Sequence, residues 1–158
     1  MLAGGAADSR ATAPPPVLDL RAAAAGELRI GDSETRVRRL WGRPLSTATT
    51  GQRQTLTYGY SGGTMRVYLA GARIRMVTLG GALRTTKGDR IATPLSTFRR
   101  RWGGAVHNSC CAVGVRHVRV PTTTRGISFA GTFRDGRLQS LTLLTESTFR
   151  SCFLAECD

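Results

Sequence analysis

The first stretch of the sequence with apolar residues at helical spacing lies between Ile30 and Gly42. Val37, Leu40 and Trp41 share one face at i, i+3 and i+4, and arginines fill the opposite side. An Asp-Ser pair precedes them, and either side chain can accept hydrogen bonds from the free N–H groups of a first helical turn. The pattern predicts a short amphipathic helix that ends at Gly42.

A degraded copy of this stretch follows sixty-one residues later, at Ile91–Gly103. Superimposing the copy on Ile30–Gly42 gives five identities in thirteen positions, including both tryptophans. Thr93 is predicted to cap the second helix, with Pro94 at its first position, where a missing N–H is harmless. The copy predicts that the chain contains two versions of one unit.

Short runs of alternating apolar and polar residues follow each predicted helix, separated by turn residues such as Gly and Ser. This alternation is typical of antiparallel strands. The predicted strands span residues 54–60, 64–70, 73–80, 112–120, 125–133 and 138–145. Asp135-Gly136, between the last two runs, is a strong signal for a two-residue hairpin.

A helical element followed by antiparallel strands, twice over, predicts the α+β fold class. Each of two pseudo-repeats would be a short helix, or helix pair, packed on an antiparallel meander of about three strands. The chain would then divide into a disordered or processed segment (1–26), the two helix-plus-sheet repeats (27–84 and 85–147) and a C-terminal tail (148–158).

Residues 31–44 read Gly-Asp-Ser, three residues, Val, and a Leu-Trp-Gly-Arg-Pro ending. This run, followed by tyrosine-containing strands, resembles the SmpA/OmlA family of small envelope lipoproteins. The tandem arrangement over residues 27–147 is similar to that of the β-lactamase inhibitory proteins. The resemblance implies a secreted or envelope-facing binding module without catalysis, although no lipobox cysteine stands near the N-terminus and no acidic, aromatic-rich inhibitory face is recognisable.

Residues 2–8, Leu-Ala-Gly-Gly-Ala-Ala-Asp, resemble the small-residue end of a secretory signal peptide, without the basic and apolar regions that precede such an end. Either the start codon lies inside a signal peptide, or the similarity reflects an alanine-rich composition. The first interpretation predicts a secreted or cell-envelope protein, and the second leaves a cytoplasmic location open. No transmembrane segment is predicted.

Four cysteines, Cys110, Cys111, Cys152 and Cys157, all lie in the second half of the chain. An even number in this arrangement is typical of exported, disulfide-bonded proteins. Because a bond between adjacent cysteines is strained, we expect Cys110 and Cys111 each to pair with one of the other two, in either order, and so to tie back the tail. Zinc ligation and free thiols are the alternatives, but the spacing differs from that of paired zinc ligands.

Positive charge dominates the composition, because 22 arginines and one lysine against 10 acidic residues leave a net charge of +13. Such an excess attracts anionic partners, and it also keeps a surface hydrated. Further arginines, including Arg66 and Arg75, are interleaved along the predicted strands. The predicted contact residues are the arginines of the two helices, with three tyrosines as weaker candidates: Arg36, Arg38, Arg39, Arg43, Arg99, Arg100, Arg101, Tyr58, Tyr60 and Tyr68.

These patterns predict a non-enzymatic binding module of the cell envelope or secreted space, which recognises a protein or an anionic polymer through its basic surface. A nucleic-acid-binding protein is the first alternative, although no DNA- or RNA-binding motif accompanies the charge. A thiol-dependent enzyme is the second, with Cys111 as nucleophile and His117 as its base. Neither a cofactor nor a metal ion is expected.

Overall fold

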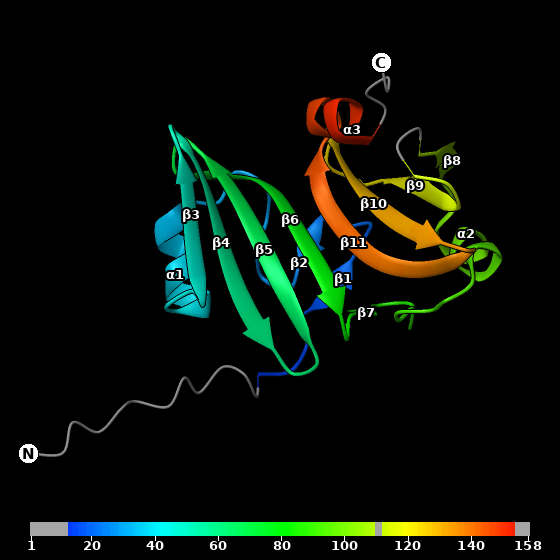
Figure 1. Ribbon diagram of the computed structural model, residues 1–158, viewed down its shortest axis with the longest axis horizontal. Helices are drawn as coiled ribbons and strands as arrows, with labels where there is room; N and C mark the ends of the chain where they lie inside the picture. The colour runs from blue at the N-terminus through cyan, green and yellow to red at the C-terminus, as the bar shows by residue number, and fades with distance from the viewer. Residues whose placement is uncertain (1–12, 110–111, 154–158) are drawn as a thin grey trace, which may run out of the picture.

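A single antiparallel sheet dominates the structure, a computed structural model that describes residues 13–109 and 112–153, with side chains up to residue 150. Its eight strands run in the order β3-β4-β5-β6-β11-β10-β9-β8 (Figure 1). The strands are β3 (Ser46–Thr50), β4 (Arg53–Tyr60), β5 (Gly63–Ala70), β6 (Arg73–Gly81), β8 (Ala105–Asn108), β9 (Val115–Pro121), β10 (Ile127–Arg134) and β11 (Arg137–Thr145).

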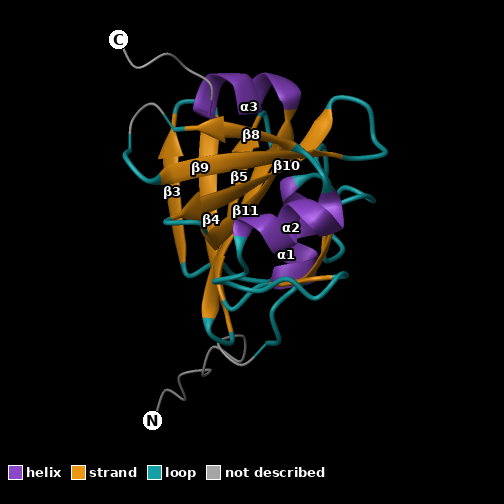
Figure 2. Cartoon of the chain, turned by 90° about the vertical axis from the view of Figure 1, so that its right-hand side faces the viewer, coloured by secondary structure: helices purple, strands orange, loops and turns teal. Residues whose placement is uncertain are grey.

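The inner face of this sheet carries the hydrophobic core. Helix α1 (Glu34–Trp41) lies at one end of the sheet and helix α2 (Leu95–Trp102) at the other (Figure 1), and both lie on the same side of the sheet (Figure 2). A small sheet of β1 (Val17–Asp19), β2 (Ala24–Ala25) and β7 (Arg84–Thr85) lies between them. Helix α3 (Glu146–Phe153) follows β11 directly.

Both predicted amphipathic helices are confirmed: the first ends at Gly42, as predicted, and Gly103 is the corresponding C-cap residue of the second. Val37 of α1 and Phe98 of α2 are fully buried in one continuous core. The side chain of Ser33 accepts a hydrogen bond from the Arg36 N–H, as expected of a capping residue. The start of α2 differs from the prediction, because Pro94 is itself the N-cap residue and makes no side-chain cap.

The predicted hairpin at Asp135-Gly136 is also confirmed. It joins β10 to β11, with Arg134 opposite Arg137. Asp135 and Gly136 adopt φ values of 51° and 74°, the left-handed region that a type I′ hairpin turn requires at both central positions.

Strands β6 and β11 join the two halves of the sheet at its centre. Val77 pairs with Leu143, Thr78 with Thr142 and Leu79 with Leu141. The hydroxyl oxygens of the two threonines are 3.0 Å apart and share a hydrogen bond. The strand order is therefore symmetric about the boundary between β6 and β11, with four strands on each side of that boundary.

The segments before the two helices are held to the sheet by equivalent hydrogen bonds. Arg73, at the start of β6, donates to the carbonyl oxygen of Gly31 at 3.1 Å, and Arg137, at the start of β11, donates to that of Ala92 at 3.2 Å. The tryptophans of the two helices differ in their partners. Trp41 packs against the ring of Tyr58, whereas the Trp102 indole N–H donates to a buried carboxylate.

The predicted α+β fold class, with each helix on its own meander of about three strands, is wrong. The structure is mostly β, and one sheet of eight strands replaces the small meanders. The prediction missed β3 because its five residues, Ser-Thr-Ala-Thr-Thr, are all exposed and show no alternation. It also missed the pairing of β6 with β11, because an apolar run indicates that a strand is buried but not which strand lies next to it.

Part of the segment predicted to be disordered or processed, residues 1–26, is folded. Leu18 and Leu20 are fully buried, and β1 pairs with β2 on one side and with β7 on the other. The Ala- and Pro-rich composition of this segment indicated disorder, so the two buried leucines were not recognised as core residues. Residues 1–12 lie outside the described chain.

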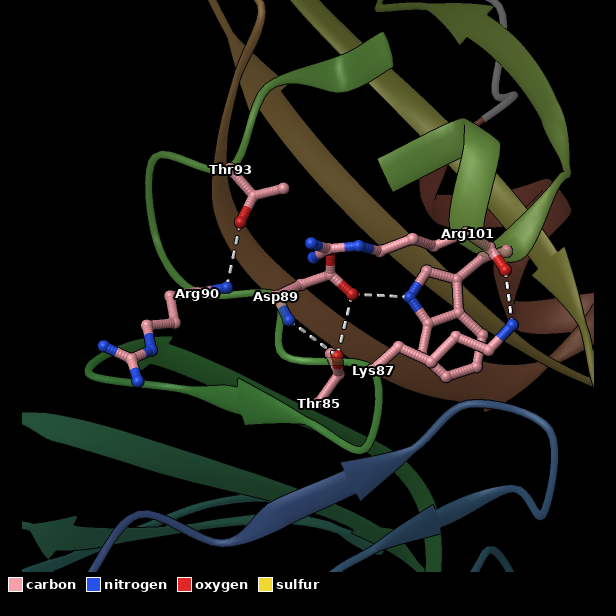
Figure 3. A network of polar contacts seen from close by, with 7 residues as sticks. Thr85, Lys87, Asp89, Arg90, Thr93 and Arg101 are labelled. Carbon is pink, nitrogen blue, oxygen red and sulfur yellow. Dashed lines mark hydrogen bonds and ion pairs between the residues drawn. The ribbon is translucent and has the colours of Figure 1, made fainter. Parts of the chain in front are cut away.

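A buried carboxylate, that of Asp89, holds the connection between β7 and α2 (Figure 3). Its side chain is fully buried and accepts hydrogen bonds from the Thr85 hydroxyl at 2.7 Å and the Trp102 indole at 2.6 Å. The Arg101 guanidinium forms an ion pair with it at 2.7 Å. Lys87 lies over the Trp102 ring, 4.4 Å from its centre. Burial removes the Asp89 carboxylate from water, and the three donors from Thr85, Trp102 and Arg101 compensate for the lost hydration.

Replacing Asp89 by alanine is expected to lower the free energy of unfolding by about 2–4 kcal/mol, because Thr85 and Trp102 would keep buried donors without an acceptor. Urea unfolding followed by circular dichroism measures the loss. Asp32→Ala is the matched control at the start of α1, where the carboxylate is part-exposed and pairs with Arg36, and about 1 kcal/mol is expected. Equal losses in both variants would contradict a special role for the buried carboxylate.

Candidate functional site

The outer face of the sheet, opposite the core, is left open over β4, β5 and β6 by the residues that the structure describes. Cross-strand pairing places two rows of side chains there, Thr55-Tyr68-Met76 and Thr57-Arg66-Thr78. All six residues are part-buried or exposed, whereas their neighbours along each strand are mostly buried in the core. Three threonines, one tyrosine, one methionine and one arginine therefore form a surface that is accessible to a partner.

Positive charge on this surface lacks internal compensation. Arg53, Arg66 and Arg75 are exposed, and none of them forms an ion pair with another described residue. Strands β3 to β6 contain no aspartate or glutamate. Arg75 stands at a register shift, because Leu69 pairs with Ile74 whereas Tyr68 pairs with Met76. We call the outer surface that contains these three arginines, Thr55, Tyr68 and Met76 the open sheet face.

A groove of about 500 Å³ crosses the open sheet face next to α3. Ala48 of edge strand β3 lines one end, and Thr148 of α3 contributes to the wall. Tyr68 and Met76 provide apolar surface, and Arg53 and Arg75 provide positive charge. The groove combines the apolar surface and the few charged groups that are typical of binding sites.

Helix α3 covers part of the same outer face in the other half of the sheet. Glu146 accepts a hydrogen bond from Arg119 of β9 at 2.7 Å and another from the Ser128 hydroxyl. Phe149 is fully buried against Ala130, Leu144 and Met76. The face therefore holds a segment of its own chain through one carboxylate and one aromatic ring.

The helix arginines predicted as contact residues fall into two groups. Three of them are paired within the chain: Arg36 with Asp32, Arg38 with Glu34 and Arg101 with Asp89. The exposed ones without an ion pair to a described residue are Arg39, Arg43, Arg99 and Arg100. Because α1 and α2 lie at opposite ends of the sheet (Figure 1), these four do not form one surface.

Two of the three predicted tyrosines are in the core. Tyr58 is 2% exposed and Tyr60 is 3% exposed. The Tyr60 hydroxyl donates to the carbonyl oxygen of Gly80 at 2.8 Å, and burial raises the pKa of Tyr60 to about 12. Tyr68 alone of the three lies in the groove. Neither buried ring is available to stack on a nucleic-acid base, as the nucleic-acid alternative requires.

Sequence reasoning placed Arg66 and Arg75 along strands but did not single out Arg53. Arg53 follows the two-residue turn that separates β3 from β4, and β3 itself was not predicted. A signal for Arg66 was present, because it stands between the apolar residues Met65 and Val67 and must therefore face away from the core. The position of Arg75 depends on the register shift, which no sequence pattern indicates.

The cysteine predictions fall outside what the structure describes. Cys110, Cys111 and Cys157 lie outside the described residues, and of Cys152 only the place in α3 is described. The disulfides, and Cys111 as a nucleophile, therefore stay predictions. Among the residues whose positions are described, no group of three His, Cys, Asp or Glu side chains could hold a metal ion.

His117, the predicted base, lies in β9 and is 8% exposed. Its Nδ1 is 3.3 Å from the Thr132 hydroxyl oxygen. Burial lowers the pKa of His117, and the neighbouring His107 lowers it further. The imidazole is therefore held preferentially in its neutral form.

Comparison with known proteins identifies the fold and no family. No protein-family profile matches the sequence, and no curated protein matches it. The resemblance to the SmpA/OmlA family therefore stays a prediction. None of the helices in the described chain has the length and apolar character needed to cross a lipid bilayer.

Two solved structures share the fold. One is an extracellular protein containing an SCP domain from Bacillus anthracis str. Ames, with a TM-score of 0.59 and 12% identity over 76% of this chain and 45% of that one. The other is a cysteine-rich secretory protein from Staphylococcus aureus subsp. aureus Mu50, with a TM-score of 0.57 and 10% identity over 89% and 50%. The chain thus spans about half the length of these proteins.

A third solved structure, of a candidate β-lactamase inhibitor protein from Streptococcus mutans, matches over 82% of this chain and 90% of that one. Its TM-score of 0.32, at 11% identity, is too low to carry any conclusion. The first two matches are close enough in shape to show a common fold, and at their identities they show the fold alone.

The lowered pKa of His117 predicts that stability depends on pH. The folded state binds protons at His117 less readily than the unfolded chain, so His117 contributes to the free energy of unfolding above about pH 6.5, and this contribution is lost as the pH falls. Chemical unfolding measured from pH 7.5 down to about pH 5 is expected to show this loss in the native protein and a weaker one in His117→Gln.

Thr132→Val serves as the control for this experiment. It removes the hydroxyl beside the imidazole and keeps the titrating group, so the dependence on pH is expected to remain. An identical dependence in the native protein and in His117→Gln would show that other groups cause it.

Proposed function

We propose that this protein is an exported, non-enzymatic binding module that holds an acidic protein on its open sheet face. The observation that carries the proposal is the set of Arg53, Arg66 and Arg75, three exposed guanidinium groups without a carboxylate partner in the described chain, on a face whose strands contain no acidic residue. Arginine is enriched at protein interfaces and binds carboxylates through two parallel hydrogen bonds.

The contacts of α3 support the chemistry proposed for the partner. On the same outer face, Glu146 is bound by Arg119 and Ser128, and Phe149 is buried beside it. The open sheet face offers comparable groups, with Arg75 and Arg53 for carboxylates and Tyr68 and Met76 for an apolar ring. A partner that presents several carboxylates and an aromatic residue would therefore be complementary in both charge and shape.

A protein partner fits this surface better than a nucleic acid does. Single-stranded nucleic acids bind to proteins largely through bases stacked on several aromatic rings. Tyr68 is the aromatic residue among the outer-face rows of β4 to β6, and hydroxyl groups surround it. Phosphates would still be attracted by the net charge of +13, but such binding is weakened steeply by salt.

Export is supported by two observations of different kinds. The two solved structures compared above are described as an extracellular and a secretory protein. The four cysteines in the second half of the chain are typical of proteins from oxidising compartments. The proposed binding role is supported by the surface itself, which offers cationic and hydroxyl groups for recognition.

Charge reversal of the open sheet face is expected to weaken binding of an acidic probe at least about tenfold, which corresponds to about 1.4 kcal/mol. The variant carries Arg53→Glu, Arg66→Glu and Arg75→Glu, and the probe is a synthetic peptide with several glutamates and one phenylalanine, the Glu/Phe peptide. Fluorescence anisotropy at about 0.15 M salt measures the affinity under conditions where distant charges are screened.

The matched control carries Arg39→Glu on α1 and Arg99→Glu and Arg100→Glu on α2, so its total net charge changes by the same amount as that of the sheet variant. Little change in affinity is expected for it. If both variants weaken peptide binding equally, the effect depends on net charge alone, which would contradict the proposal. Tighter binding to single-stranded DNA than to the Glu/Phe peptide, with a preference for particular bases, would favour the nucleic-acid alternative.

A further inference from the structure

Strand β3 forms a free edge of the eight-stranded sheet. Among the strands of the described chain, only β4 pairs with it, and all five of its residues are exposed. Alternate residues of an edge strand direct their N–H and C=O groups away from the neighbouring strand. Since a two-residue turn makes Thr50 and Arg53 the closing pair of the β3–β4 hairpin, the outward groups belong to Thr47 and Thr49.

This edge lacks the features that usually prevent an edge from pairing. Within Ser46–Thr50 there is no proline and no charged residue, and the register with β4 is unbroken. The opposite edge, β8, also has no proline and no acidic or basic residue apart from His107, and its register with β9 is unbroken, but it is shorter and more covered. It has four residues, two of them part-buried, and the ring of His107 packs against Phe149 of α3 at 5.5 Å between centres.

The free edge continues directly onto the open sheet face. Leu45, which precedes β3, is 60% exposed, and its Cδ1 lies 3.0 Å from the position that a Cβ on Gly59 would occupy. Gly59 alternates with the buried Tyr58 and Tyr60, so Leu45 lies over the outer face. Ala48 of the same strand lines the groove. An exposed apolar side chain and the groove therefore flank the unpaired main chain.

We infer that β3 receives an extended segment of the acidic partner as an additional strand of the sheet. Main-chain hydrogen bonds to Thr47 and Thr49 would give affinity, and alternate side chains of the segment would reach Leu45 and the groove. The inference rests on the proposed function, because the partner is the one that the open sheet face recognises, and it adds the conformation in which that partner binds.

The partner is a different molecule and not a second copy of this chain. Pairing of two β3 edges would bring together two surfaces of the same sign, each belonging to a chain with a net charge of +13. Like charges placed together across an interface oppose association. An acidic segment on the same edge brings its carboxylates toward Arg53 and Arg75 at the adjoining groove.

Amide hydrogen exchange measured by NMR tests the inference. The probe is a short peptide of alternating glutamate and valine. With the peptide at about ten times its Kd, exchange at Thr47 and Thr49 is expected to slow about tenfold. Ser46 and Ala48, whose amides face β4, serve as internal controls and should change little.

Two forms of the peptide separate strand addition from attraction between charges. In a strand, successive amides point to opposite edges, so N-methylation of one alternate set should weaken binding about tenfold, and N-methylation of the other set should leave it unchanged. In the protein, Thr49→Pro removes an outward N–H and is expected to weaken binding about tenfold, whereas Thr49→Val keeps the N–H and the affinity. Circular dichroism of both variants checks that each is folded.

The outcomes distinguish this inference from the proposed function. Strand addition would be overturned if binding depends on Arg53, Arg66 and Arg75 but is unchanged by N-methylation, with no protection of the Thr47 and Thr49 amides. The proposal of an acidic partner would not be affected by that result. Protection of these two amides without peptide, which increases with protein concentration, would identify a second copy as the occupant and overturn the inference. Failure of the Glu/Phe peptide to bind would overturn the proposed function itself.

Discussion

The pairing of β6 with β11 is the constraint on which the rest of the structure depends. Val77 faces Leu143, Leu79 faces Leu141, and the hydroxyls of Thr78 and Thr142 bond to each other between them. Without this ladder the chain would form two small sheets, each with an additional free edge and each too small to bury a large core alone. With it, both inner faces share one core, which Val37 of α1 and Phe98 of α2 enter from opposite ends.

One continuous sheet also means one continuous outer face, and the described part of the chain covers only a portion of it. Helix α3 uses Glu146 and Phe149 to cover the region above β10 and β11. Over β4 to β6 the same face is left with Arg53, Arg66 and Arg75 and without a carboxylate. The sheet is held by its core side, so the outer side chains of this half are available for recognition without a loss of stability.

The sequence predicted the local elements better than their assembly. Helical spacing located α1 and α2, and Asp135-Gly136 located a hairpin, because these features depend on neighbouring residues. The fold class was wrong because pairing between β6 and β11 joins residues far apart in sequence. The contact residues were predicted on the helices, where Asp32, Glu34 and Asp89 neutralise three of the arginines, and no pattern in the sequence shows that Asp89 is buried. The disposition of Arg75 depends on a register shift that only the folded sheet reveals.

The central claim is that recognition occurs on the open sheet face and not on the helices. The most direct measurement is an NMR chemical-shift map of the isotopically labelled protein during titration with the Glu/Phe peptide. The largest changes are predicted on the outer positions of β4 to β6, at Arg53, Arg66, Tyr68 and Met76. Changes centred on α1 and α2, at Arg39, Arg99 and Arg100, with the sheet positions unmoved, would contradict the account.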